Sequence, residues 1–291
     1  MWYEDREEML GITNNKTILR YMPADKVIYL LRYKKLYLPT AVKYEDSDLN
    51  EARFSRSYVN VVRNWFRKSF KDDDSTDLFF TSTISNLLAA REVSFISCWT
   101  HKDKEDAKLW EYFANDFSGV AIYSTIQKVN EELFNFCEEN SPFDVRSNAV
   151  TYDRENAHTY IDGANEVDDY HLPFFFLDGD SDPDTDFEHE QEYRFILYNA
   201  EELQKTSERL FVTDSVSFDG NHINISKFRR RVNTKKQRGK SIKVPVDLSN
   251  LLIKISLGSR ISKKNEKIIR RLIERNCPNV LIVKSKCLPK A

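Results

Sequence analysis

The chain has 291 residues, of which 41% are hydrophobic, so it is long and apolar enough to form a substantial core. Its 44 basic and 46 acidic residues nearly cancel, which argues against binding to nucleic acid or membranes through overall charge. No run of 18 or more apolar residues occurs, and residues 1–8 are acidic where a signal peptide is basic, so we expect a cytoplasmic protein with no membrane partner.

The first half of the chain alternates predicted helices and strands. Residues of high β propensity predict strands at 17–21 and 35–38, on either side of a helix at 24–32. Asp48 and Glu51 form a capping box before a helical stripe that reaches about residue 70. Periodicity then predicts a helix over 77–91, a buried strand over 93–99, a helix over 107–115, a strand over 119–123 and a helix that begins at Thr125.

The second half is predicted to be richer in strands. We expect strands at 149–152, at 190–198 and at 211–218, with a hairpin turn at Asp219-Gly220 before a strand at 222–225. The C-terminal part predicts a strand over 251–257, a helix over 262–275 and a strand over 280–283. No repeat or linker divides the chain, which predicts one α+β domain over residues 1–291, with flanking helices around a mixed or mostly antiparallel sheet.

Two glutamates open the predicted strand at 190–198. Side chains two residues apart share one face of a strand, so Glu190, Glu192 and Arg194 are expected to point the same way while Tyr193 and Phe195 enter the core. Such a face is either the edge of an active site or a ladder of ion pairs.

Metal chemistry is not expected. The acidic loop at 178–186 has Pro183 where an EF-hand loop needs Gly, and His189 where it needs Glu. No P-loop, dinucleotide-binding glycine motif, nucleophile elbow or zinc-binding pair of histidines is present. A metal-dependent phosphodiesterase is therefore a third, less favoured hypothesis, and it would draw on Asp184, Asp186, Glu190 and Glu192.

One segment is strongly basic. Residues 227–243 contain nine basic residues and no acidic one, so they are able to neutralise phosphates of a nucleic acid. The candidate contacts are Arg229, Arg230, Arg231, Lys235 and Lys236. The alternative is a solvated loop within a hairpin connection, because Phe228 alone offers an aromatic stacking surface.

The order of several short motifs is similar to that of a known family. They are Leu19-Arg20-Tyr21, Leu36-Tyr37-Leu38-Pro39, Ser97-Cys98-Trp99-Thr100, Leu109-Trp110-Glu111-Tyr112, Gly119, Val150-Thr151-Tyr152, Glu190-Gln191-Glu192-Tyr193-Arg194 and Ile255-Ser256-Leu257-Gly258. Over about residues 17–262 this order resembles the bacterial domain-of-unknown-function family 2971. Members of that family often accompany phage-defence and abortive-infection genes, so the resemblance implies a toxin or effector role and a phage-defence partner protein.

A second resemblance concerns chemistry. Arg on a first strand, Ser or Thr on a middle strand and E-x-E on a late strand are similar to the R-S-E class of ADP-ribosyltransferases. The resemblance implies that Arg20 holds a phosphate of NAD, that Thr100 or Ser97 supports the nicotinamide ribose and that Glu192 is the catalytic carboxylate, with Glu190 acting on the acceptor. Tyr21 and Trp110 complete the candidate cofactor-binding residues, although aromatic side chains of this kind more often belong to a core.

The leading hypothesis is thus an NAD-using transferase that modifies protein or nucleic acid. Its rival is a non-catalytic nucleic-acid-binding or protein-interaction module, such as an antitoxin or sensor, that uses the basic segment 227–243. A purely structural alternative also remains, in which Arg20 pairs with Glu190 or Glu192.

Overall fold

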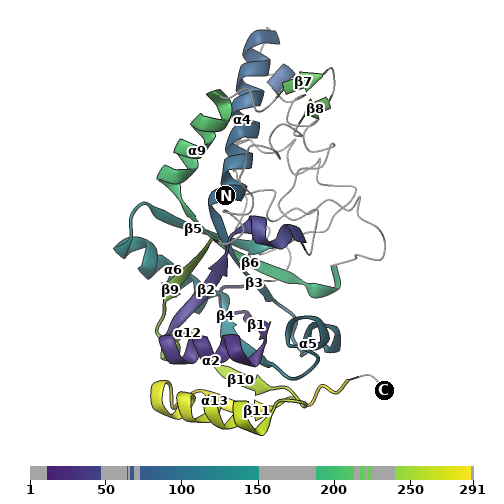
Figure 1. Cartoon of the computed structure of the whole chain (residues 1–291), viewed down its shortest axis with the longest axis vertical. Helices are drawn as coiled ribbons and strands as arrows, with labels where there is room; N and C mark the ends of the chain where they lie inside the picture. The colour runs from purple at the N-terminus through teal and green to yellow at the C-terminus, as the bar shows by residue number, and fades with distance from the viewer. Residues whose placement is uncertain are drawn as a thin grey trace.

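The computed structural model describes residues 12–46, 64, 66–68, 73–150, 188–212, 217–219, 222–224 and 240–289. Figure 1 shows a central sheet with helices packed around it and two helices extending away from one end. No helix within these ranges is both long and apolar enough to cross a membrane.

The central sheet contains seven strands in the order β11-β10-β4-β1-β3-β6-β5. Neighbouring strands are antiparallel except for β10 and β11, which are parallel. The strands are β1 (Thr17–Met22), β3 (Ser94–Thr100), β4 (Val120–Thr125), β5 (Phe143–Ala149), β6 (Glu192–Asn199), β10 (Lys254–Leu257) and β11 (Leu281–Lys284). Two smaller sheets pair β2 (Lys35–Pro39) with β9 (Ser241–Pro245), and β7 (Ser217–Asp219) with β8 (His222–Asn224).

Helices cover both faces of the central sheet. The larger apolar core lies between one face and α2 (Ala24–Tyr33), α6 (Ile126–Glu139), α12 (Leu248–Leu251) and α13 (Lys263–Asn276). On the other face, α5 (Ala107–Phe113) contributes Leu109 and Trp110 to a smaller core. This arrangement is the predicted α+β fold with a mixed sheet and flanking helices.

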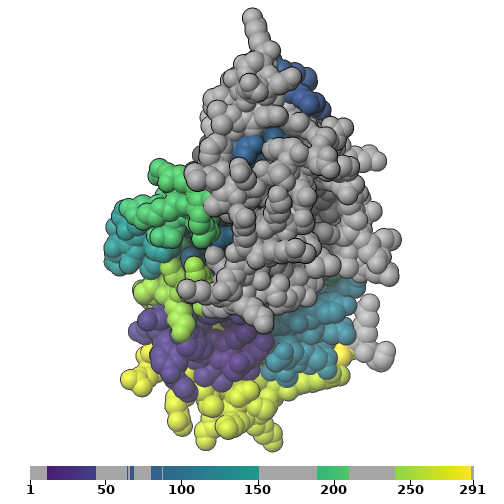
Figure 2. All heavy atoms as spheres, turned by 45° about the horizontal axis from the view of Figure 1, so that its top comes forward, coloured from purple at the N-terminus to yellow at the C-terminus, as the bar shows by residue number. Residues whose placement is uncertain are grey.

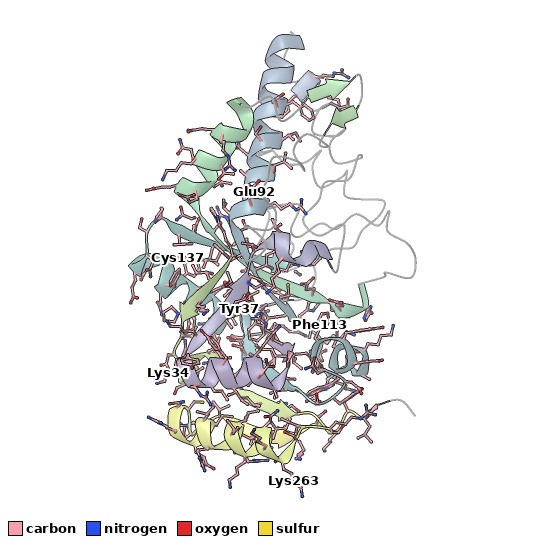
Figure 3. The ribbon with its side chains drawn as sticks, in the orientation of Figure 1. Lys34, Tyr37, Glu92, Phe113, Cys137 and Lys263 are labelled. Carbon is pink, nitrogen blue, oxygen red and sulfur yellow. The ribbon has the colours of Figure 1, made fainter. Side chains whose placement is uncertain are left out.

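Two helices extend away from the sheet in Figure 1, namely α4 (Asp73–Val93) and α9 (Ala200–Val212). Arg209 of α9 lies 3.2 Å from the carboxylate of Glu92, which is buried near the end of α4. Burial raises the pKa of Glu92 despite the attraction of Arg209, because removal from water penalises the charged carboxylate. Figure 3 labels Glu92 at the base of this helix pair.

Helix starts agree well with the capping residues in the sequence. The Thr125 hydroxyl accepts a hydrogen bond from the backbone N–H of Lys128 at the start of α6, and Ser262 accepts one from Asn265 at the start of α13. Asp106 caps α5 in the same way, accepting from the N–H groups of Lys108 and Leu109. Each side chain satisfies an N–H that the first helical turn leaves unpaired.

Most predicted elements in the described ranges are confirmed, but the second half contains several errors, including a strand predicted to begin at residue 251, which lies in α12. Strand β5 ends at Ala149, where the sequence predicted a strand to begin, and β9 was not predicted at all. Helix α9 covers 200–212 and overlaps the start of the strand predicted at 211–218, whereas the hairpin is confirmed by the pairing of Asp219 with His222. The helix predicted from the capping box at Asp48 falls largely outside the described residues.

Candidate functional site

The strands that carry the predicted site are neighbours in the sheet. Arg20 lies on β1, Ser97 and Thr100 lie on β3, and Glu192 opens β6; these strands are consecutive in the order β1-β3-β6. The contact between the first two is short, because β1 and β3 pair only at Leu19 and Thr100. By contrast, β3 and β6 pair along their whole length. The topology therefore brings the three motif strands together.

The register places Arg20 and Glu192 on opposite faces of the sheet. Leu19 is opposite Thr100, and Thr100 is opposite Glu192, so these three side chains share one face. Side chains alternate along a strand, which puts Arg20 on the other face. The expectation that Arg20 and Glu192 line one site is therefore not met by the geometry of these strands.

Arg20 instead belongs to a polar group within the larger core face. Its guanidinium donates a hydrogen bond of 2.9 Å to the Ser97 hydroxyl, which also accepts a 3.0 Å bond from the indole N–H of Trp99. The guanidinium carbon lies 6.0 Å from the centre of the Trp99 ring, within the range of a cation–π contact. These contacts give Arg20 and Ser97 a local structural role on that face.

The opposite face of β3, β6 and β5 carries a buried polar cluster, which we call the Glu192 face. It consists of the buried residues Thr100, Asn148, Glu192 and Arg194 and of half-buried Cys98, and the register places Cys98, Arg194 and Asn148 side by side in one row. Arg194 donates to a carboxylate oxygen of Glu192 at 2.8 Å, and their side chains are only 4% and 7% exposed. Burial of two charges costs several kcal/mol per ion before their attraction repays it. This cost makes the pair a candidate for a functional role as well as for a structural one.

The second glutamate of the motif does not join this face. Glu190 ends a short 3-10 turn (Glu188–Glu190), and Gln191 adopts a positive φ of 45°, so β6 begins only at Glu192. The prediction that Glu190, Glu192 and Arg194 share one strand face is therefore wrong for Glu190. The prediction that Tyr193 and Phe195 enter the core is confirmed, since both are fully buried.

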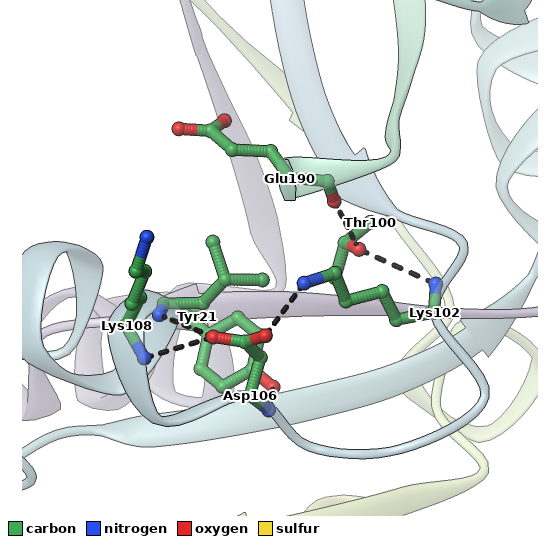
Figure 4. Close-up of polar contacts among 7 residues, drawn as sticks. Tyr21, Thr100, Lys102, Asp106, Lys108 and Glu190 are labelled. Carbon is green, nitrogen blue, oxygen red and sulfur yellow. Dashed lines mark hydrogen bonds and ion pairs between the residues drawn. The ribbon is translucent and has the colours of Figure 1, made fainter. Parts of the chain in front are cut away.

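Thr100 joins this turn to the start of the loop that follows β3. Its hydroxyl donates a 2.6 Å bond to the carbonyl of Glu190 and accepts one from the backbone N–H of Lys102, as Figure 4 shows. The Lys102 ammonium then reaches Asp106, and the Asp106 N–H donates to the Tyr21 hydroxyl at 2.9 Å. Thr100 thus fixes the entrance to β6 beside Glu192.

Tyr21 and Trp110 are core residues of the smaller cluster. Trp110 is fully buried, stacks against Phe117 at 6.0 Å and meets the Tyr21 ring edge-on at 5.2 Å. A side chain enclosed in this way offers no open ring face to a ligand. Among the candidate cofactor-binding residues, the structure thus gives Tyr21 and Trp110 packing roles.

Glu105 anchors the same cluster. Its carboxylate accepts hydrogen bonds from the Tyr123 hydroxyl at 2.6 Å, from the Trp110 indole at 3.2 Å and from Ser285 near the C-terminus. Burial disfavours the charged carboxylate, but hydrogen bonds that include these three outweigh it and lower the pKa of Glu105. The carboxylate therefore ties β4, α5 and the segment after β11 together.

We expect Glu105→Gln to lower the free energy of unfolding by about 1–3 kcal/mol at neutral pH, because an ionised acceptor makes stronger hydrogen bonds than an amide. The lowered pKa means that wild-type protein binds fewer protons at Glu105 when folded than when unfolded. Its stabilisation is therefore complete above the unfolded pKa of about 4.3 and lost as the pH falls through the folded value. Urea unfolding at pH 7 and pH 3 measures this, and an equal difference at both pH values would contradict it.

The Glu192 face has suitable groups for chemistry on a charged substrate. A carboxylate stabilises a developing positive charge, a guanidinium binds or orients anionic oxygens, and a carboxamide offers both donor and acceptor groups. Arg146, an exposed residue of β5, lies on the same face beyond Asn148. No pattern in the sequence indicates Asn148 or Arg146, because their position beside Arg194 depends on the pairing of β5 with β6.

Other predicted residues fall outside the described ranges. These are the acidic loop at 178–186, with Asp184 and Asp186, and the basic residues Arg229, Arg230, Arg231, Lys235 and Lys236. Within the described ranges, no group of three or more His, Cys, Asp or Glu side chains is arranged to hold a metal ion.

Comparisons with protein-family models, curated proteins and solved structures find no match to this chain.

Proposed function

We propose that the protein is an NAD-using, ADP-ribosyltransferase-like effector whose reaction centre is the Glu192 face. The observation that carries the proposal is the buried ion pair between Glu192 and Arg194, next to Thr100 and Asn148. The adjacency of β1, β3 and β6 supports it, because these strands carry the motifs that resemble the R-S-E class. The proposal keeps the resemblance to family 2971 and its phage-defence role, with protein or nucleic acid as the acceptor and the cytoplasm as its location.

In this proposal, the roles of several residues differ from those that the resemblance to the R-S-E class implies. Glu192 is the catalytic carboxylate, and Arg194 is a positioning residue that holds one of its oxygens. Thr100 fixes the turn before Glu192 through the carbonyl of Glu190. Arg146 takes the phosphate-binding role first assigned to Arg20, because it is an exposed guanidinium on the same face as Glu192.

The reaction requires a carboxylate close to the nicotinamide ribose. The bond between ribose C1′ and the nicotinamide nitrogen breaks, and its electron pair leaves with nicotinamide. Positive charge that develops on the ribose is stabilised by the Glu192 carboxylate, as in glycoside hydrolysis. An oxygen or nitrogen of the acceptor then bonds to C1′ and loses its proton.

Glu192→Gln is expected to reduce nicotinamide release from NAD at least about 100-fold, because an amide cannot supply the negative charge. Release is measured with purified protein and cell lysate as the source of acceptor. Glu202→Gln is the control, since Glu202 is exposed on α9. Glu192→Asp and thermal unfolding curves separate a loss of chemistry from a loss of folding.

Two outcomes would contradict the transferase proposal. The first is wild-type protein that releases no nicotinamide with any lysate fraction. The second is a folded Glu192→Gln protein whose release equals that of the parent.

The alternative is a non-catalytic nucleic-acid-binding or protein-interaction module, an antitoxin or sensor, that uses the segment 227–243. The structure describes residues 240–243 of this segment, and they support the alternative only through their charge. Lys240 is exposed, and the Lys243 ammonium lies 5.3 Å from the Tyr29 ring centre. A folded protein that binds nucleic acid or a partner protein but releases no nicotinamide from NAD would favour this alternative.

A further inference from the structure

The C-terminal part of the chain is far more basic than the whole. Residues 254–291 contain eleven Lys and Arg but only two acidic residues, whereas the complete chain has a net charge of −2. Most of these cations lie on or beside α13, which forms the edge of the molecule opposite the extending helices in Figure 1. The positive charge is thus concentrated at one end of the protein.

The inner side of α13 is already used in packing. Ile269 and Ile273 are buried in the larger core, with Leu272 packed against it. The side chain of Asn276 donates a 2.8 Å hydrogen bond to the carbonyl of Leu31 at the end of α2. These contacts fix which side of the helix faces solvent.

The outer side of α13 forms a basic ridge, defined by Lys263, Lys267, Arg271 and Arg275. All four are exposed, and they follow one another at intervals of four residues, which corresponds to about 6 Å along a helix axis. Figure 2 shows this C-terminal part in yellow along the lower surface, and Figure 3 places Lys263 at that edge. Lys263, Lys267 and Arg271 line a shallow hollow on the helix surface together with Arg270 and the two acidic residues Glu266 and Glu274.

The acidic residues of α13 leave most of this charge uncompensated. Glu266 is 2.9 Å from Arg270 and also 2.9 Å from Lys284 of β11. Hydrogen bonds from Lys284 and Arg270 lower the pKa of Glu266. Its carboxylate therefore pairs with two cations that are not part of the ridge. Glu274 is the other acid on the helix, near the C-terminal end.

We propose that the basic ridge of α13 binds the phosphate backbone of double-stranded nucleic acid. Four cations spaced along one helix suit contacts with a line of phosphates, and the major groove of B-form DNA admits an α-helix. An anionic membrane is a poorer partner, because an interfacial helix must insert its apolar side and the apolar side of α13 is buried. This surface is separate from the Glu192 face and does not depend on the proposed transferase activity.

The ridge is expected to bind without reading base sequence. Its side chains are Lys and Arg throughout, and phosphate contacts position a protein on a duplex without discriminating between bases. Binding is therefore expected to depend strongly on salt. Four phosphate contacts give a slope of about −3.6 for the logarithm of affinity against the logarithm of salt concentration.

Fluorescence anisotropy with end-labelled duplex DNA and duplex RNA tests this proposal. In the full-length protein, Lys267→Gln with Arg271→Gln is expected to weaken binding at least about tenfold at 0.1 M salt and to reduce the slope by about 2. The control is Lys104→Gln with Lys205→Gln, which changes the net charge equally at two exposed residues elsewhere. Circular dichroism confirms that each variant is folded, and the two labelled duplexes show which nucleic acid is preferred.

Three results would overturn the proposal. They are no binding of either duplex by wild-type protein at low salt, equal affinity in the ridge and control variants, and binding to anionic vesicles of phosphatidylserine and phosphatidylcholine without binding to duplexes. None of these results bears on nicotinamide release by the Glu192 face.

Discussion

Arg194→Met is expected to lower the free energy of unfolding by about 3–5 kcal/mol, because it removes the ion-pair partner of a buried carboxylate. Glu192 is only 5% exposed, so water cannot readily replace the guanidinium. Methionine fills part of the space but supplies no charge. Urea unfolding of wild-type and variant proteins at neutral pH measures this loss.

The double variant Glu192→Leu with Arg194→Met distinguishes a functional pair from a structural one. Apolar side chains often replace a buried ion pair with no loss of stability, because neither charge then has to leave water. We expect the double variant to be more stable than Arg194→Met and close to wild type, but unable to release nicotinamide from NAD. A double variant as unstable as Arg194→Met would show that the polar pair holds the sheet together.

The fold was largely predictable where local signals and tertiary structure agree. Thr125 and Ser262 cap helices that also have a clear apolar side, so α6 and α13 begin where the sequence places them. Strand β5 lacks such a signal because it alternates polar and apolar residues weakly, and its existence depends on pairing with β6. Strand β9 is likewise defined by its partner β2, far away in the sequence.

The candidate site was less predictable, for two physical reasons. Gln191 adopts a positive φ that breaks the alternation of side chains, and nothing in a Glu-Gln-Glu sequence indicates this for a residue other than glycine or asparagine. The face on which Arg20 lies depends on the register of β1 against β3, which the sequence of either strand leaves open. Motif order therefore named strands that lie next to one another in the sheet, but it did not predict the directions of their side chains.

Two glycines among the ordered motifs have a clear steric explanation. Residues 115–117 follow α5 in a turn with three successive positive φ angles of 47°, 50° and 63°. This turn is held by bonds from the N–H of Arg260 to the carbonyl of Phe117 and from the N–H of Gly258 to the carbonyl of Gly119, each 3.0 Å long. The backbones at Gly119 and Gly258 approach closely here, which leaves no room for a side chain.

Gly258→Ala is expected to lower the free energy of unfolding by about 3 kcal/mol or more, because the added methyl group would overlap the backbone carbonyl of Phe117. A carbonyl in a hydrogen-bonded turn cannot move aside as a flexible side chain would. Ser259→Ala is the matched control, since it alters the exposed neighbouring residue and is expected to change stability by less than about 0.5 kcal/mol. Thermal and urea unfolding compare the two variants, and equal stability would mean that the turn at 115–117 shifts freely to admit the methyl group.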